Sequence, residues 1–81
     1  MEIRVQFFSY YRDLTGCAQA SIEVPESSRL GDLTQQIHQQ FPKLAGTEKS
    51  TLVAVGVEYQ DREYVLAEGD EVSLFPPVQG G

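Results

Sequence analysis

Two consecutive prolines near the end of the sequence limit what the last part of this chain can form. Proline fixes φ and has no backbone N–H, so Pro76 and Pro77 cannot continue a central sheet strand. The apolar strand predicted before them should therefore end at Phe75, and the chain should leave it as a stiff, extended tail. Gly80 and Gly81 lack a Cβ, so they can enter a slot that is too narrow for any side chain. We expect the terminal carboxylate, an anion at neutral pH, to be the working group because it can attack an activated phosphate.

An ordinary frayed terminus is the competing interpretation of this tail. It fits less well, because only Val78 and Gln79 separate the two prolines from the two glycines and no linker precedes the tail. We therefore predict a folded domain over residues 1–75 and a tail over residues 76–81.

The composition indicates a small acidic domain. The 81 residues include six Lys or Arg and twelve Asp or Glu, which gives a formal net charge of −6. The basic residues are scattered singly, so we expect neither nucleic acid nor a membrane surface as partner, whereas a basic partner protein fits. The start of the sequence shows no apolar stretch of signal or membrane length, and Cys17 is the single cysteine, so we expect a cytoplasmic protein.

Alternating apolar residues predict two strands at the start of the chain. Ile3, Val5 and Phe7 form one face of the first strand and Phe8 falls on the other. Residues 9–16 predict a short helical segment that starts at a capping Ser9. The second strand, over residues 18–24, should pair with the first as a hairpin.

The clearest helix is predicted from an N-cap at Ser28, give or take one residue, to Phe41. Leu30, Leu33 and Ile37 form one apolar stripe with Phe41, and the following proline ends the helix. Residues 42–51 should form a polar connection.

The second half of the chain predicts further strands. Residues 52–57 are almost continuously apolar, which is typical of a central strand. A polar turn follows, then a glycine turn before a last strand in which Val72 and Leu74 point inward and Ser73 and Phe75 outward. A hairpin, a helix and further strands pack most simply as a mixed sheet with the main helix across one face. We therefore predict an α+β, β-grasp (ubiquitin-like) fold with the first and last strands parallel.

The sequence resembles the small, sulfur-carrying subunits of molybdopterin synthase over its whole length. The resemblance rests on residues 3–8 (IRVQFF), on residues 66–72 (LAEGDEV) and, most specifically, on the terminal FPPVQGG. Gly56 departs from the asparagine that many members of this family carry, but both residues tolerate positive φ, so the turn should persist.

The resemblance implies a carrier that is not catalytic alone and binds no cofactor itself. An ATP-dependent, E1-like activating enzyme would adenylate the Gly81 carboxylate, and a sulfur-donating enzyme would supply the sulfur of a thiocarboxylate. The tail would then enter the large subunit, within a complex of two small and two large subunits, and give its sulfur to a cyclic pyranopterin precursor of the molybdenum cofactor. In that picture the residues that lie in the partner's slot are Pro76, Pro77, Val78, Gln79 and Gly80.

Three other functions remain open from the sequence. A thiamine-pathway sulfur carrier shares the Gly-Gly end but is not expected to carry the Phe-Pro-Pro-Val segment before it. A ubiquitin-like protein modifier would join the same terminus to lysine. A non-covalent β-grasp interaction module would make no use of the two glycines.

Few other residues suggest a site. Phe8 and Phe75 should share the outer face of the sheet beside the tail, with Tyr59 near them, and we predict a docking patch there. Cys17 has no neighbouring motif and is expected to be an ordinary small residue, while His38 is expected to be solvated. No spacing of metal ligands is present, so no metal is expected. Asp70 and Glu71 are the acidic residues most suited to steer a basic partner.

Overall fold

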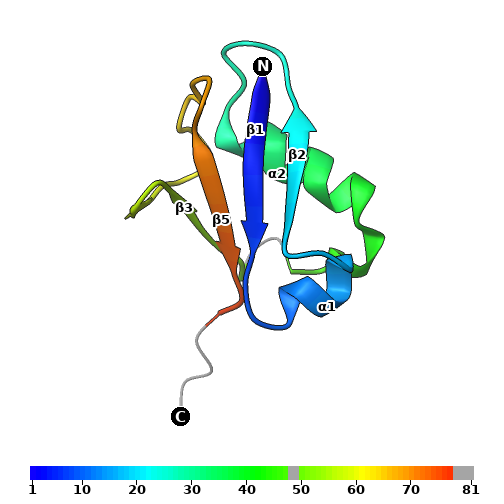
Figure 1. Ribbon diagram of the computed structural model, residues 1–81. Coiled ribbons are helices and arrows are strands. Elements are labelled where there is room, and N and C mark those ends of the chain that lie inside the picture. The colour runs from blue at the N-terminus through cyan, green and yellow to red at the C-terminus, as the bar shows by residue number, and fades with distance from the viewer. Residues whose placement is uncertain (48–49, 78–81) are drawn as a thin grey trace.

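A computed structural model describes residues 1–47 and 50–77 and shows a five-stranded mixed sheet with one main helix (Figure 1). The strands lie in the order β2-β1-β5-β3-β4. The elements in chain order are β1 (Glu2–Phe7), α1 (Tyr11–Thr15), β2 (Gln19–Glu23), α2 (Leu30–Gln40), a short 3-10 helix (Pro42–Leu44), β3 (Leu52–Val55), β4 (Glu58–Tyr59) and β5 (Glu71–Phe75).

The first and last strands lie side by side at the centre of the sheet (Figure 1). β1 and β5 are parallel, with Val5 opposite Val72 and Phe7 opposite Leu74. β2 pairs with β1 as an antiparallel hairpin, and β3 pairs with β5 in the antiparallel sense. This is the predicted β-grasp fold, so the fold class is confirmed.

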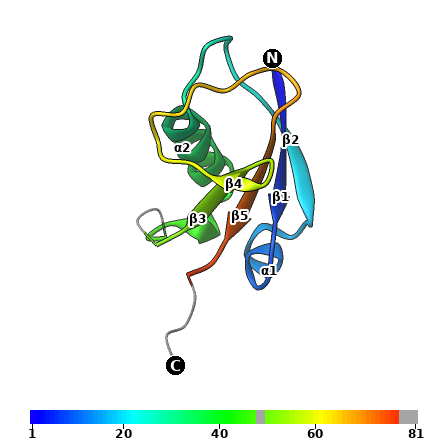
Figure 2. The same cartoon turned by 90° about the vertical axis from the view of Figure 1, so that its left-hand side faces the viewer.

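The core lies between the sheet and α2, which crosses one face (Figure 2). Leu33 and Ile37 on α2 are fully buried, and so are Ile3, Val5 and Val72 on the two central strands. The period-2 pattern of the strands and the 3.6-residue pattern of the helix therefore meet in one apolar layer. We call this side of the sheet the inner face and the opposite side the outer face.

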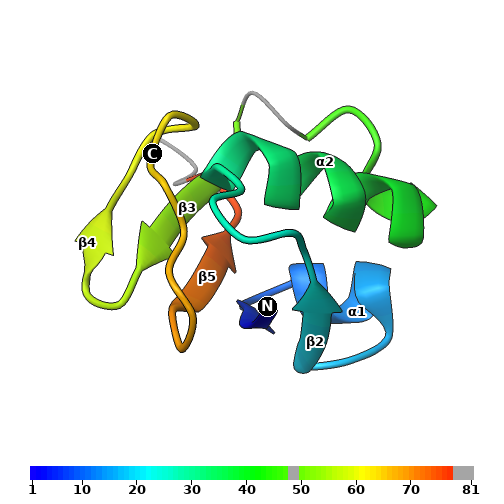
Figure 3. The ribbon, with the colours of Figure 1, turned by 90° about the horizontal axis from the view of Figure 1, so that it is seen from above.

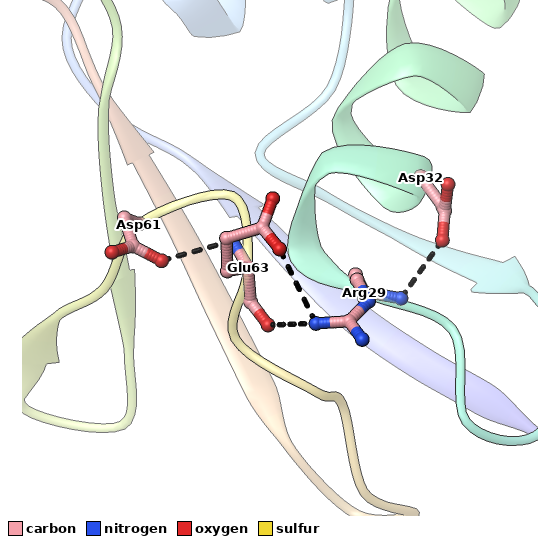
Figure 4. Close-up of polar contacts among 4 residues, drawn as sticks. All are labelled: Arg29, Asp32, Asp61 and Glu63. Carbon is pink, nitrogen blue, oxygen red and sulfur yellow. Dashed lines mark hydrogen bonds and ion pairs between the residues drawn. The ribbon is translucent and has the colours of Figure 1, made fainter.

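The start of α2 is held by the loop between β4 and β5. Its cap is Arg29, one residue after the predicted Ser28, and the Arg29 N–H donates to the Asp32 carboxylate over 2.9 Å. The Arg29 guanidinium also contacts the Glu63 carbonyl at 3.0 Å and the Glu63 carboxylate at 3.4 Å (Figure 4). Backbone N–H groups of the first helical turn lack partners inside a helix, and here Leu30 and Gly31 donate theirs to carbonyls of the same loop, at Tyr64 and Arg62.

Two local predictions from the sequence were wrong. Ser9 does not cap α1: its φ is 57°, and the capping position falls on Tyr10 without a side-chain hydrogen bond. The connection after α2 is not simply polar, because Pro42 starts a short 3-10 helix that buries Leu44 in the core. Leu44 and Ala45 are the apolar residues of a mainly polar stretch and show no helix or strand periodicity, so the burial of Leu44 could not be predicted from a local pattern.

The strand predicted over residues 52–57 is shorter and more exposed than expected. β3 ends at Val55, and Ala54 is its single buried residue. Gly56 adopts a φ of 62° and turns the chain into the two-residue strand β4, which leaves Val57 fully exposed at the tip. The antiparallel hairpin of β3 and β4, which we call the β3–β4 end, therefore extends beyond the part of the sheet that α2 covers (Figure 3).

Candidate functional site

Three aromatic side chains gather on the outer face where β5 ends. The rings of Phe8 and Phe75 are stacked, with centroids 4.6 Å apart and planes 14° from parallel. The ring of Tyr59 meets Phe75 edge-on at 6.4 Å. Tyr59 is 68% exposed and Phe8 36% exposed, so the cluster faces solvent. We call Phe8, Tyr59 and Phe75 the aromatic patch.

The register of the sheet places these residues together. Phe7 lies opposite Leu74 in the parallel β1–β5 pair, so the next residues, Phe8 and Phe75, emerge side by side on the opposite face. The Phe8 N–H donates to the Leu74 carbonyl over 3.2 Å and continues the pairing by one residue. Leu52 on β3 lies opposite Phe75, is 37% exposed and extends the apolar surface toward Tyr59.

The tail starts directly from this patch. β5 ends at Phe75, and Pro76 and Pro77 follow it half-buried. The predicted tail residues Val78, Gln79, Gly80 and Gly81 lie outside the described residues. The chain therefore leaves the sheet beside the stacked rings.

The opposite end of the outer face is polar. Arg4 and Glu71 form an exposed ion pair at 3.7 Å. The Asp70 carboxylate accepts hydrogen bonds from the Ala67 N–H at 2.8 Å and the Tyr64 hydroxyl at 3.2 Å, so it holds the Gly69 turn together. Exposed ion pairs contribute little to stability, so this pair is not what holds β1 and β5 together.

Cys17 and His38 show no arrangement for chemistry. Cys17 is half-buried beside Thr15, with 3.8 Å between its Sγ and the Thr15 Oγ1. His38 is not freely solvated as predicted: Nδ1 lies 2.7 Å from the Thr34 carbonyl and Nε2 lies 3.3 Å from the Thr47 hydroxyl. The Thr34 contact lies within one helical turn, whereas Thr47 reaches His38 only because the chain folds back after the 3-10 helix.

Within residues 1–47 and 50–77, no group of three His, Cys, Asp or Glu residues is placed to hold a metal ion. In the same part of the chain, no helix is long and apolar enough to span a membrane.

Comparison with known proteins decides the family. Residues 5–81 match the model of the ThiS family. The chain belongs to the ThiS family. Its relatives include the molybdopterin synthase sulfur carrier subunits of Chlamydomonas reinhardtii (34% identical, covering 100% of both chains) and Homo sapiens (31% identical, covering 99% of this chain and 94% of the relative). The family expected from the sequence is thus confirmed.

Other relatives carry different names. Small archaeal modifier protein 3 of Haloferax volcanii is 30% identical over 100% of both chains. Among solved structures, a putative molybdopterin converting factor subunit 1 of Pyrococcus furiosus is 29% identical, with a TM-score of 0.88 over 96% of this chain and 99% of that one. A chain from a complex of subunits 1 and 2 of the molybdopterin-converting factor of Helicobacter pylori is 27% identical, with a TM-score of 0.72 and full coverage of both chains.

Proposed function

We propose that this ThiS-family chain works as the sulfur carrier subunit of a molybdopterin synthase and carries the sulfur on the carboxyl group of Gly81. The observation that supports this most is the position of Phe75. It is the last residue of the central strand β5, it stacks on Phe8, and the proline-stiffened tail follows it directly. A rigid sheet therefore fixes where the tail begins.

The chemistry follows from the terminal group. A carboxylate is a poor electrophile, so an ATP-dependent activating enzyme first joins it to AMP and releases pyrophosphate. Sulfur at the sulfide oxidation level, supplied by a sulfur-donating enzyme, then displaces AMP and leaves a thiocarboxylate, which is a soft nucleophile at the end of the narrow tail. The thiocarboxylate sulfur attacks a cyclic pyranopterin precursor, and water hydrolyses the resulting thioester, so that the sulfur stays on the precursor and the carboxylate is restored. The chain binds no cofactor of its own in this scheme, and ATP is used by the activating enzyme.

The large subunit of molybdopterin synthase is the partner that receives the tail. The Helicobacter pylori relative occurs in a complex of subunits 1 and 2, which supports such an assembly for this chain. The aromatic patch supplies the docking surface, because aromatic side chains are enriched at the cores of protein interfaces. Two small and two large subunits, together in the cytosol, form the complex in this proposal.

A protein modifier is the second candidate, because a relative at 30% identity is a small archaeal modifier protein. The same activated terminus would then form an isopeptide bond with a lysine of a target protein. The two functions share the activation step and differ in the acceptor.

Intact mass spectrometry distinguishes these functions. The chain is incubated with host cytosolic extract, ATP and a sulfur donor, beside a control chain that carries one extra residue after Gly81. The carrier function predicts replacement of one oxygen by sulfur on the C-terminal peptide of the native chain alone. A ladder of lysine-linked conjugates supports the modifier instead, and an unchanged mass contradicts both.

A further inference from the structure

A groove of about 700 Å³ lies on the other side of the β3–β4 end from the aromatic patch. One wall is α2 and the other is formed by β3, β4 and the residues that follow them (Figure 3). Its apolar lining includes Leu30, Leu52, Val53 and Tyr59. The groove exists because α2 packs over the central strands and leaves the edge of the sheet uncovered.

Both ends of the groove are held by hydrogen bonds. At one end, Gly31 donates its N–H to the Arg62 carbonyl over 3.0 Å, and the contacts of Arg29 fix Glu63 (Figure 4). At the other end, Thr51 donates to the Thr47 carbonyl over 2.7 Å and contacts the Tyr11 hydroxyl at 2.7 Å. Such fixed walls make the groove a preformed site, and a preformed site reduces the ordering cost of binding.

The lining favours a peptide backbone over a charged ligand. Gln35 on α2 and Gln60 after β4 line the groove, and neither side-chain amide makes a hydrogen bond within the described part of the chain. An amide offers both a donor and an acceptor, as does each peptide unit of an extended chain. The charged lining residues, Asp61 and Arg62, are adjacent and of opposite sign, so no charge is concentrated there.

The groove is continuous with the aromatic patch. Tyr59 lines the groove and also meets Phe75 in the patch. Leu52 lines the groove and lies opposite Phe75 in the sheet. Tyr59 belongs to β4, the outermost strand on this side of the described sheet, and Leu52 belongs to the neighbouring strand β3. A protein that covers the patch can therefore pass around this edge into the groove.

We propose that the groove is the second half of the docking surface and takes an extended, uncharged segment of the large subunit, with an aliphatic side chain against the partly exposed Val53. This inference rests on the proposed function, because it assigns the groove to the partner that receives the tail. The large subunit thus contacts the β3–β4 hairpin from both faces at the end where Leu52 and Tyr59 lie.

The test compares two glutamines of α2 that are both exposed. Gln35 lines the groove, whereas Gln40 does not and lies on another side of the helix. Gln35→Trp and Gln40→Trp are each titrated with the large subunit by calorimetry, after circular dichroism has shown an unchanged fold. We expect Gln35→Trp to weaken binding at least about tenfold, as for a blocked interface pocket, and Gln40→Trp to change it by less than about twofold.

A second measurement follows amide hydrogen exchange in the wild-type complex. We expect slower exchange over residues 53–62 as well as at Phe75. Wild-type affinity of Gln35→Trp, or equal weakening by both tryptophans, overturns the inference. Weakened binding to the activating enzyme alone also overturns it, and so does self-association of the free chain that Gln35→Trp abolishes. Failure of the proposed function is seen separately, as a missing sulfur on the wild-type terminus.

Discussion

Phe7 and Phe8 are consecutive residues that serve two different regions of this molecule. Phe7 points to the inner face, where it is 2% exposed and meets the Phe41 ring edge-on at 5.3 Å. Phe8 points to the outer face and stacks on Phe75 in the aromatic patch. Aromatic pairs thus occur on both faces of the sheet. The inner pair is buried under α2, whereas the outer pair is exposed to solvent. Burial by the helix, rather than residue type, decides which pair stabilises the fold and which is available for binding.

The largest effect should come from truncating the inner aromatic residue. We expect Phe7→Ala to lower the free energy of unfolding by about 3–5 kcal/mol, because it removes a buried ring and leaves a cavity. Urea denaturation followed by circular dichroism measures this loss. Phe8→Ala is the matched control, with an expected loss below about 1.5 kcal/mol. Equal losses for the two variants would contradict the division of roles between the faces.

The next effect concerns binding. We expect Phe75→Asp to weaken binding of the large subunit at least about tenfold while the fold persists, because it places a charge at the centre of the aromatic patch. Calorimetric titration gives the dissociation constant, and circular dichroism checks the fold. Glu71→Gln, at the polar end of the same strand and face, is the control with a smaller expected change. An unchanged affinity of Phe75→Asp would remove the patch from the interface.

A smaller effect should report the stacking itself. A double-mutant cycle with Phe8→Ala and Phe75→Ala should show a coupling of about 0.5–1.5 kcal/mol in unfolding free energy, the range for aromatic pairs in such geometry. The centroid distance of 4.6 Å places the two rings in direct contact. A coupling energy near zero would mean that the contact between the Phe8 and Phe75 rings does not stabilise the fold.

The smallest effect should appear at alkaline pH. The pKa of Tyr64 is raised above its ordinary value, first by burial and next by the hydrogen bond of its hydroxyl to Asp70. A raised pKa of an acid means that the folded state holds the proton more tightly, so this contribution is present below the unfolded pKa of about 10 and is lost above it. Denaturant titrations at increasing pH should therefore show falling stability in the wild type and a weaker fall in Tyr64→Phe. Identical profiles of the two chains would show that Tyr64 makes no such contribution.

The periodic elements and the glycine turns could be predicted from sequence. Alternation in residues 3–7 and 72–75 identified the two central strands and assigned Phe8 and Phe75 to one face. Gly69 was expected at a turn, and it has a positive φ of 89°. These features depend on neighbours within a few residues, so a local pattern is sufficient to find them.

Other features depend on segments far apart in the sequence. The uncovered β3–β4 end and its groove arise from where α2 packs, which residues 52–62 do not encode by themselves. The burial of Leu44 and the contact of His38 with Thr47 likewise depend on the path of the 3-10 segment. A polar or non-periodic stretch carries no signal for such contacts.

The sequence by itself determined the β-grasp fold, the family and the end of the last strand at Phe75, because each depends on short-range patterns or on a specific terminal motif. The tertiary structure alone decided that the rings of Phe8 and Phe75 stack, that Tyr59 meets Phe75 edge-on, and that the groove opens behind them. The physical reason is that strand order, register and helix position bring together residues separated by up to 67 positions, and no local pattern measures that distance.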